Sequence, residues 1–348
     1  MSSRLGSRPV SVGEDLLERA PVASARMTVP MDPMAELEPF RRQLTGFCYR
    51  MLGSGSEAED AVQETMLRAW RAADGFEGRA SVRSWLYRIA TNVCIDMSRS
   101  VQRRARPMEM GPASRPDESL LGAPLSESTW VTPIPDDRLD PVGSDPAQVA
   151  ERRESIRLAF VAALQHLPPR QRAALILCEV LRWRASEVAE LLDVSVAAVN
   201  SALQRSRATL ATLPPDPTAH VTLDDDASDL LARFVDAFER YDIPQLVTLL
   251  REDVVMSMPP FAMWLRGAEN VGRFMLEPTP SLCRDSRLLP LTANGCPAFA
   301  QFKPDPAGGR SPWGIQVLEV SDGRIAGFHC FLGPELFAFF GLPDHLAA

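Results

Sequence analysis

Aromatic, arginine and amide side chains gather along the stretch from Arg79 to Asn92, and their types suit contacts with unpaired DNA bases. Unstacked bases stack on aromatic rings and guanidinium planes, gaining about 1–3 kcal/mol per base, while arginines neutralise phosphates. The residues that such chemistry would use are Arg79, Arg83, Trp85, Tyr87, Arg88 and Asn92. For any single aromatic, the alternative is a core position in a solvated helix bundle.

A helix must present these groups, and its start and its apolar stripe are visible in the sequence. Ser81 has the type and position of an N-cap. Leu86, Ala90 and Val93 then recur at helical spacing and predict the buried side. The residues listed above fall largely on the opposite side of this helix.

A second amphipathic helix precedes it, across a break that contains glycines. Ser56 and Glu59 have capping-box spacing, which predicts a helix that begins near Glu57. Its apolar residues, which we expect to face a core, are Ala61, Val62, Met66, Ala69 and Trp70. Its other face is polar with one apolar residue, and consists of Asp60, Gln63, Glu64, Leu67 and Arg68.

These segments resemble region 2 of the extracytoplasmic-function (ECF) sigma factors, the promoter-recognition subunits of bacterial RNA polymerase. The resemblance rests on the runs EDAVQETMLRAW, FEGRAS and WLYRIATNVCID. It implies that the face with Asp60 and Arg68 binds the clamp coiled coil of the polymerase largest subunit. It also implies that a loop from Phe76 to Ser81, together with Asn92 and Asp96, captures bases of the melted minus-ten element.

A second all-helical pattern ends in a predicted helix-turn-helix. Ala189 is small enough for two helices to cross closely, and Val194 and Val199 are expected to fill the angle between them. Ser195 can cap the second helix. Asp193 stands at the turn position that glycine usually holds, and Asp tolerates the left-handed conformation there.

The second helix of this motif has one packing side and one polar side. Val199, Leu203 and Leu210 form the packing side. The residues left to meet DNA, with the capping serine, are Ser195, Ala197, Ala198, Asn200, Ser201, Gln204, Arg205 and Arg207. The pattern resembles region 4 of the same sigma family, which places this helix in the major groove of the minus-thirty-five element. Asn and Gln suit adenine and Arg suits guanine, whereas Arg207 is expected on phosphate.

Charge and composition set limits on how the chain meets DNA. The 348 residues carry 37 basic and 45 acidic side chains, a net charge of −8. Because non-specific affinity comes from neutralising phosphates, such a chain needs a partner that supplies most of the DNA contact, as core RNA polymerase would.

The stretch 107–147 is acidic and rich in Pro, Ser and Gly, which predicts a flexible linker. Two interpretations stay open for it. It is either a loose spacer or, as the family resemblance implies, a thread through the RNA channel of the polymerase. In the second case the groups in place of phosphates are Asp136, Asp137, Asp140 and Asp145.

The last third of the chain reads as helices followed by strands, an α+β order. Strands are expected at about 287–293, 297–303, 313–320 and 324–332, with Asp322-Gly323 as a hairpin turn. The order, the DGRI turn and the FGLPDHL ending resemble the SnoaL-like group of the ketosteroid-isomerase and nuclear-transport-factor superfamily. That resemblance implies a curved sheet wrapped by helices around a pocket. Its expected lining is Met256, Met258, Trp264, Trp313 and His329.

No catalytic site, metal site or cofactor is expected. Asp253, Glu319 and His329 are titratable, but the sequence places no acid and base together in one pocket. The six Cys form no CxxC and the four His have no ligand spacing. The expected setting is therefore a reducing cytoplasm, and no apolar run is long enough to indicate a membrane span.

The expected fold is multi-domain, with two all-α helical domains followed by an α+β SnoaL-like cone domain. Its expected parts are a disordered leader at 1–30, sigma region 2 at 31–106, the acidic linker at 107–147, sigma region 4 with the helix-turn-helix at 148–213, a linker at 214–225 and the SnoaL-like domain at 226–348. The whole resembles the actinobacterial sigma factors of the SigG type.

The resemblance implies a sigma factor that binds core RNA polymerase and promoter DNA and directs promoter-specific transcription initiation. The C-terminal domain would then regulate it through intramolecular contact with regions 2 and 4, with or without a small apolar ligand. Two alternatives stay open. A helix-turn-helix regulator with a ligand-binding SnoaL-like domain leaves the region 2 pattern unused, and a SnoaL-like isomerase or cyclase explains only the last third.

Overall fold

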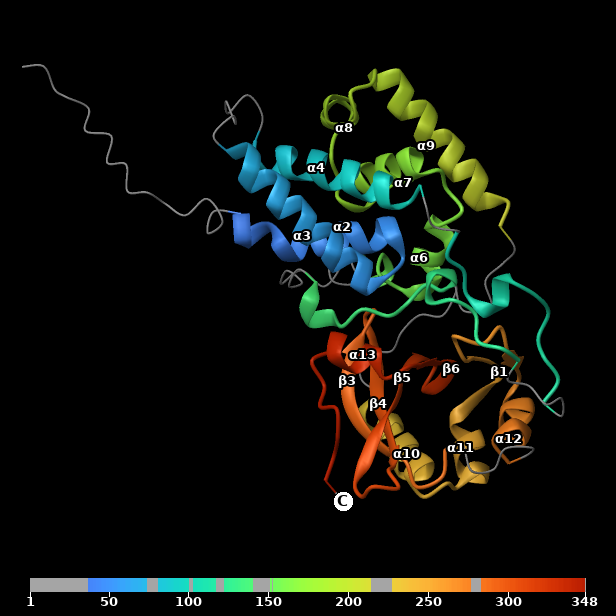
Figure 1. Ribbon diagram of the computed structural model, residues 1–348. Helices are drawn as coiled ribbons and strands as arrows, with labels where there is room; N and C mark the ends of the chain where they lie inside the picture. The colour runs from blue at the N-terminus through green and yellow to red at the C-terminus, as the bar shows by residue number, and fades with distance from the viewer. Residues whose placement is uncertain are drawn as a thin grey trace, which may run out of the picture.

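The computed structural model describes residues 37–73, 81–99, 103–116, 122–139, 151, 153–213, 227–276 and 283–347. The expected leader, the expected linker at 214–225 and the candidate residues Phe76, Arg79, Asp140 and Asp145 lie outside them. Figure 1 shows two groups of helices lying together, with a curved sheet and its own helices beneath them.

The first helical module consists of a 3-10 turn η1 (Glu38–Phe40) and the helices α2 (Arg41–Leu52), α3 (Gly55–Ala72) and α4 (Val82–Met97). Helix α2 ends at Gly53, whose φ of 73° is readily adopted only by glycine. Ser54 caps α3 by accepting from the Glu57 backbone N–H at 3.4 Å, so the predicted cap at Ser56 is wrong by two residues. Ser81 caps α4 as predicted, accepting from the Ser84 N–H at 3.1 Å.

The second helical module consists of α6 (Leu158–Leu164), α7 (Pro169–Leu175), a π-turn η6 (Ile176–Val180), α8 (Ala185–Leu192) and α9 (Val196–Ala211). Asp193 ends α8 with a φ of 54°, and Ser195 caps α9 through the Ala198 N–H at 3.1 Å, both as predicted. Val199 and Ala189 are buried in the angle. Val194 is 36% exposed, so its expected place between the helices is wrong.

The C-terminal domain contains α10 (Ser228–Glu239), α11 (Ile243–Leu249), β1 (Leu250–Ser257), β2 (Trp264–Arg266), α12 (Ala268–Leu276), β3 (Arg287–Ala293), β4 (Cys296–Pro304), β5 (Arg310–Ser321), β6 (Arg324–Leu332) and α13 (Glu335–Phe339). The sheet order is β2-β1-β6-β5-β4-β3, in which only the β1–β6 pair is parallel. The four strands predicted from the sequence are β3 to β6.

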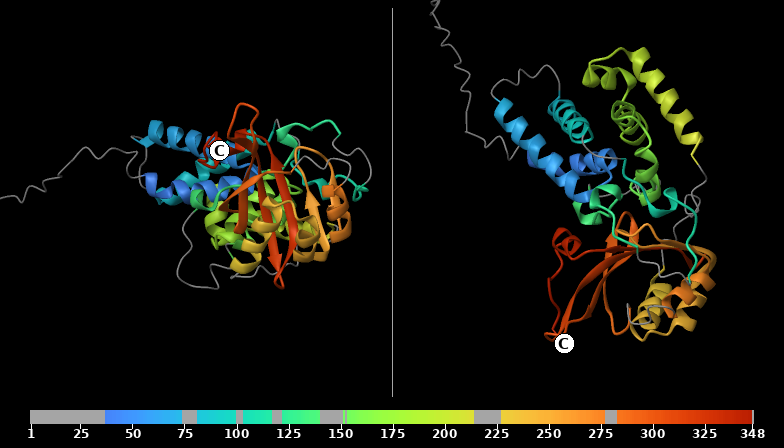
Figure 2. Two further views of the ribbon diagram at one scale, coloured as in Figure 1. Left: turned by 90° about the horizontal axis from the view of Figure 1, so that it is seen from below. Right: turned by 45° about the vertical axis from the view of Figure 1, so that its right-hand side comes forward.

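The two faces of this sheet pack against different partners. One face, with Leu318 and Phe328, packs on α10, α11 and α12. The other face, with Val317 and Phe331, belongs to an apolar core that is shared with both helical modules. Figure 2 shows the sheet lying between its own helices and the two helical modules. We call this second face the outer face of the sheet, because it points away from the sheet's own helices. It is nevertheless buried, at the interface with the two helical modules.

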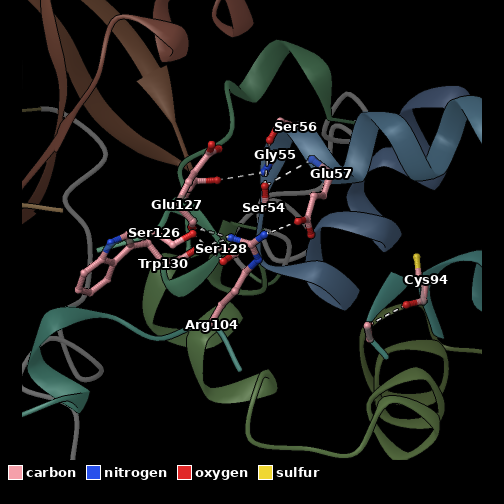
Figure 3. Close-up of polar contacts among 12 residues, drawn as sticks. Ser54, Gly55, Ser56, Glu57, Cys94, Arg104, Ser126, Glu127, Ser128 and Trp130 are labelled. Atoms are coloured by element: carbon pink, nitrogen blue, oxygen red, sulfur yellow. Dashed lines mark hydrogen bonds and ion pairs between the residues drawn. The ribbon is translucent and has the colours of Figure 1, made fainter. Parts of the chain in front are cut away.

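Part of the described linker, residues 130–135, is buried against the modules, which the prediction of a flexible linker did not include, whereas residues 122–127 are exposed. The described linker contains the 3-10 turns η3 (Pro107–Glu109), η4 (Glu127–Thr129) and η5 (Asp136–Arg138). Trp130 and Ile134 are buried. Figure 3 shows Arg104 holding this segment, because its guanidinium donates to the carbonyl of Trp130 at 2.8 Å and pairs with Glu57. The prediction used the composition averaged over the whole segment, in which a few apolar residues such as Trp130 and Ile134 have little weight.

Candidate nucleic-acid interface and its closure

Helix α4 presents most of the predicted base-contacting residues to solvent. Ser81, Arg83, Arg88, Asn92 and Asp96 are exposed. Four of them, Ser81, Arg88, Asn92 and Asp96, follow one another along one side of the helix, whereas Arg83 lies on the side of the buried Tyr87 and covers its ring.

Two aromatics on α4 do not fit the expectation. Tyr87 is fully buried, with its ring centroid 5.2 Å from that of Phe47 and 5.1 Å from that of Trp183. Burial raises the pKa of Tyr87 to about 12. Trp85 is half-buried and packs against the core. Tyr87 is therefore a core residue here, which was the alternative stated for single aromatics.

The second helical module contacts two of these exposed residues, Arg88 and Arg83. The Arg88 guanidinium donates to the backbone carbonyl of Glu190 in α8 at 2.8 Å. The Arg83 guanidinium carbon lies 5.0 Å from the centroid of the Trp183 ring, which is cation–π range. Two groups expected to meet DNA are thus already engaged within the chain.

Helix α9 has the predicted division into a buried and an exposed side. Val199 and Leu203 are buried, and Ser201 is half-buried. The residues that α9 and its cap expose are Ser195, Ala197, Ala198, Asn200, Gln204, Arg205 and Arg207. Arg207 pairs with Glu179 at 2.5 Å, so this expected phosphate contact also has a partner within the chain.

The polar face predicted on α3 is exposed, and it is larger than predicted. Asp60, Gln63 and Arg68 are exposed, while Glu64 is half-buried and pairs with Arg68 at 2.6 Å; Leu67 is 45% exposed. Trp70 is 52% exposed, so its expected core position is wrong.

Trp70 follows Leu67 by three residues, so both lie on one side of α3. The pair gives this face an apolar centre. The Leu67–Trp70 spacing within an otherwise polar face was the signal that could have placed Trp70 correctly.

The C-terminal domain encloses a cavity of about 20 Å³, room for about one water molecule. Met256, Met258 and Trp313 line it as expected. Trp264 does not, because its indole N–H instead donates to the Gly111 carbonyl of the linker at 3.0 Å. His329 does not either, because strand alternation places it on the outer face of the sheet.

His329 belongs to a buried polar cluster that the sequence did not reveal. Its Nδ1 is hydrogen-bonded to Ser257 at 2.8 Å, and its Nε2 lies 3.9 Å from a carboxylate oxygen of Glu319. Arg157, at the start of α6, reaches Glu319 at 3.3 Å. Gly327 leaves the room for this meeting, since a Cβ there would lie 2.7 Å from Glu319.

Burial opposes ionisation of Glu319, yet the contacts with His329 and then the charge of Arg157 hold its pKa at about 2. Glu319 and His329 are an acid and a base side by side, but they are only 1% and 2% exposed. This cluster therefore joins the sheet to the second helical module and offers no open site for a substrate. Among the residues that the structure describes, no group of three or more His, Cys, Asp or Glu side chains could hold a metal ion. None of the described helices has the length and apolarity needed to cross a membrane.

Comparison with known proteins accounts for all three parts of the chain. Residues 37–104 match the family model of Sigma-70 region 2, residues 157–210 that of Sigma-70, region 4, and residues 231–328 that of a SnoaL-like domain. The ECF RNA polymerase sigma factor SigG of Mycobacterium tuberculosis is 44% identical over 320 residues, which are 90% of this chain and 85% of the relative. The ECF RNA polymerase sigma factor SigJ of the same species is 29% identical over 255 residues, 70% of this chain and 72% of the relative.

The fold is also found in a solved structure. The crystal structure of the M. tuberculosis ECF sigma factor SigJ aligns with 89% of this chain and 99% of its own, at 23% identity and a TM-score of 0.54. The region 2 match and the SigG relative rule out both alternatives left open by the sequence, a lone helix-turn-helix regulator and an isomerase or cyclase. The chain therefore belongs to the ECF sigma factors, which act in transcription initiation and are not enzymes, and it carries a SnoaL-like domain behind sigma-70 regions 2 and 4.

Proposed function

We propose that this sigma factor binds core RNA polymerase and reads its promoters with two separate surfaces. The first helical module captures melted minus-ten bases along α4, through Ser81, Arg83, Arg88, Asn92 and Asp96. The second reads the minus-thirty-five element with α9. One observation supports the proposal most. Helix α9 exposes Asn200, Gln204 and Arg205, whose side chains can hydrogen-bond to base edges, and its other side is packed in the core through Val199 and Leu203.

Run-off transcription with core enzyme on genomic templates tests the proposal and returns the promoters. Asn200→Ala and Gln204→Ala should change which promoters are used, since a lost base contact costs about 1–3 kcal/mol at one position. Arg207→Ala is the matched control on the same helix, because a phosphate contact positions the helix without specifying sequence. It should weaken all promoters about equally. An unchanged promoter set with the Asn200 and Gln204 variants would refute the minus-thirty-five assignment.

For the polymerase, we propose the exposed face of α3 as the binding surface, which consists of Asp60, Gln63, Glu64, Leu67 and Arg68, now joined by Trp70. Support comes from the apolar centre that Leu67 and Trp70 give to a charged rim, the composition that protein interfaces favour. A factor that works with polymerase acts in the cytoplasm, which we propose as its location.

For the C-terminal domain, we propose regulation. It packs against both modules through the outer face of its sheet while α4 is partly covered by α8. In this arrangement Arg83 and Arg88 are not free for DNA. Deletion of 214–348 tests the role: in vitro promoter activity equal to that of the full chain would count against it.

A further inference from the structure

The turn between β3 and β4 occupies an unusual place for a hairpin tip. Asn294 has a φ of 56° and Gly295 one of 70°, the left-handed geometry of an Asn-Gly turn. Such turns normally lie in solvent, yet Asn294 is 0% exposed. The hairpin between β5 and β6 offers a contrast within the same domain. Asp322 and Gly323 have the same left-handed geometry, and both are exposed.

Asn294 makes hydrogen bonds to three different segments of the chain. Its side-chain N–H groups donate to the hydroxyl of Tyr49 at 2.7 Å and to the carbonyl of Ile156 at 2.6 Å. Its side-chain oxygen accepts from the Ile134 N–H at 3.0 Å, and its own backbone N–H donates to the Ile134 carbonyl at 3.1 Å. Tyr49 belongs to α2, Ile134 to the linker, and Ile156 lies just before α6.

The contacts of Asn294 are reinforced on either side. The Gly295 N–H donates to the Asp136 carboxylate in the linker at 2.9 Å. Arg157, the neighbour of Ile156, forms an ion pair with Glu319 on β5, with 3.3 Å between its Nη2 and the carboxylate Oε1. Buried hydrogen bonds of this kind are costly to break singly, because each broken bond leaves a desolvated partner. One turn of the C-terminal domain thus holds the first module, the linker and the entrance of the second module at a fixed spacing.

That spacing does not suit promoter DNA. Elements at minus ten and minus thirty-five lie tens of ångströms apart on B-DNA, at about 3.4 Å per base pair. In the structure, by contrast, α4 and α8 are in hydrogen-bond contact through Arg88 and Glu190. Both modules can engage the two elements only after they separate.

We infer that the Asn294-Gly295 turn is a pin that keeps the two sigma modules in a closed arrangement unable to span a promoter. The inference rests on the regulatory role proposed for the C-terminal domain and assigns that role to one contact. The turn binds other segments of the same chain: α2, the linker and the segment just before α6. Release of the turn removes these ties on the linker and on the start of α6, and the second module can then separate by breaking its remaining contacts with α2.

Asn294→Gly in the full chain is the test variant. Glycine retains the left-handed turn, so the substitution removes only the three side-chain hydrogen bonds. Asp322→Gly is the matched control, since it makes the same kind of change at the exposed turn of the same domain. Two readouts need no polymerase: hydrogen exchange of the Ile134 amide, which bonds directly to Asn294, and the radius of gyration from small-angle X-ray scattering.

For Asn294→Gly, we expect the Ile134 amide to exchange about tenfold faster or more, the effect of losing hydrogen bonds of ordinary net strength. The radius of gyration should rise, while exchange in α10 stays unchanged. Asp322→Gly should match the wild type in both readouts. A radius of gyration for Asn294→Gly equal to that of Asp322→Gly overturns the pin.

A second variant covers the case in which Asn294→Gly fails to fold. Tyr49→Phe removes the hydroxyl that accepts from Asn294 and keeps the buried ring. It should raise Ile134 exchange in the same direction by a smaller factor, and no change would overturn the inference. Transcription at limiting sigma is measured separately, and Asn294→Gly should exceed the wild type. If the wild type itself fails to transcribe, the proposed function fails, while exchange and scattering still decide the pin.

Discussion

Trp70 shows what one side chain on an exposed face can contribute. It is 52% exposed on α3, three residues after Leu67, so its loss should cost little folding stability, within about 0.5 kcal/mol. Because Trp70 is the aromatic centre of the proposed binding face, the substitution Trp70→Ala should weaken binding to core polymerase by about 2 kcal/mol or more. Titration of core enzyme with labelled Trp70→Ala measures this. Met66→Ala is the contrasting control, because Met66 is buried and its loss should destabilise the fold by about 2–5 kcal/mol. Equal affinity of Trp70→Ala and wild type would remove Trp70 from the interface.

Single residues also show how much of the structure could be predicted from the sequence. Helical spacing correctly placed Leu86 and Val93 in the core of the first module and Val199 under α9. It could not place Tyr87, because that ring is covered by Phe47 from another helix and by Trp183 from another module. Spacing within a helix reports which side is apolar, but not which distant segment covers the polar side.

At the scale of elements, the strand patterns were sufficient to locate β3 to β6, but the pocket lining implied by the resemblance misassigned His329. A sheet face away from its own helices normally meets solvent, whereas this one is buried under α6 and the linker. The linker was misjudged for the related reason that Trp130 and Ile134 have partners only in the assembled chain. The sequence therefore predicted elements well and the contacts between modules poorly.

The contact between β5 and α6 has a predictable pH dependence. The pKa of Glu319 lies near 2 in the folded chain and is higher when unfolded, so its stabilisation is present at neutral pH and is lost as the pH falls from about 4.5 to 2. The charged or titratable groups that face it are Arg157, Arg106, His329 and Cys296. Glu319→Gln should destabilise the chain by about 3 kcal/mol at pH 7, because buried Arg157 then loses its buried carboxylate and keeps only the ion pair with the exposed Glu154.

Urea unfolding of wild type and Glu319→Gln from pH 7 to pH 2 measures this dependence. The difference between the two should shrink as the pH falls, with Glu269→Gln, at an exposed position, following the wild type throughout. A constant difference down to pH 2 would mean that the ionised form of Glu319 does not carry the contact.

For the whole molecule, a core shared by both helical modules and the outer sheet face implies that these parts unfold together. The inner face of the sheet, packed on α10 to α12, forms a separate cluster. We expect the helical modules and the outer-face strands of the wild type to lose hydrogen-exchange protection at one urea concentration. In Asn294→Gly the helical modules should lose it at a lower concentration than the sheet, because the turn that couples them is gone. Coincident loss of protection in that variant would show that the shared apolar core alone couples the domains, and that opening for a promoter must begin elsewhere than at the Asn294-Gly295 turn.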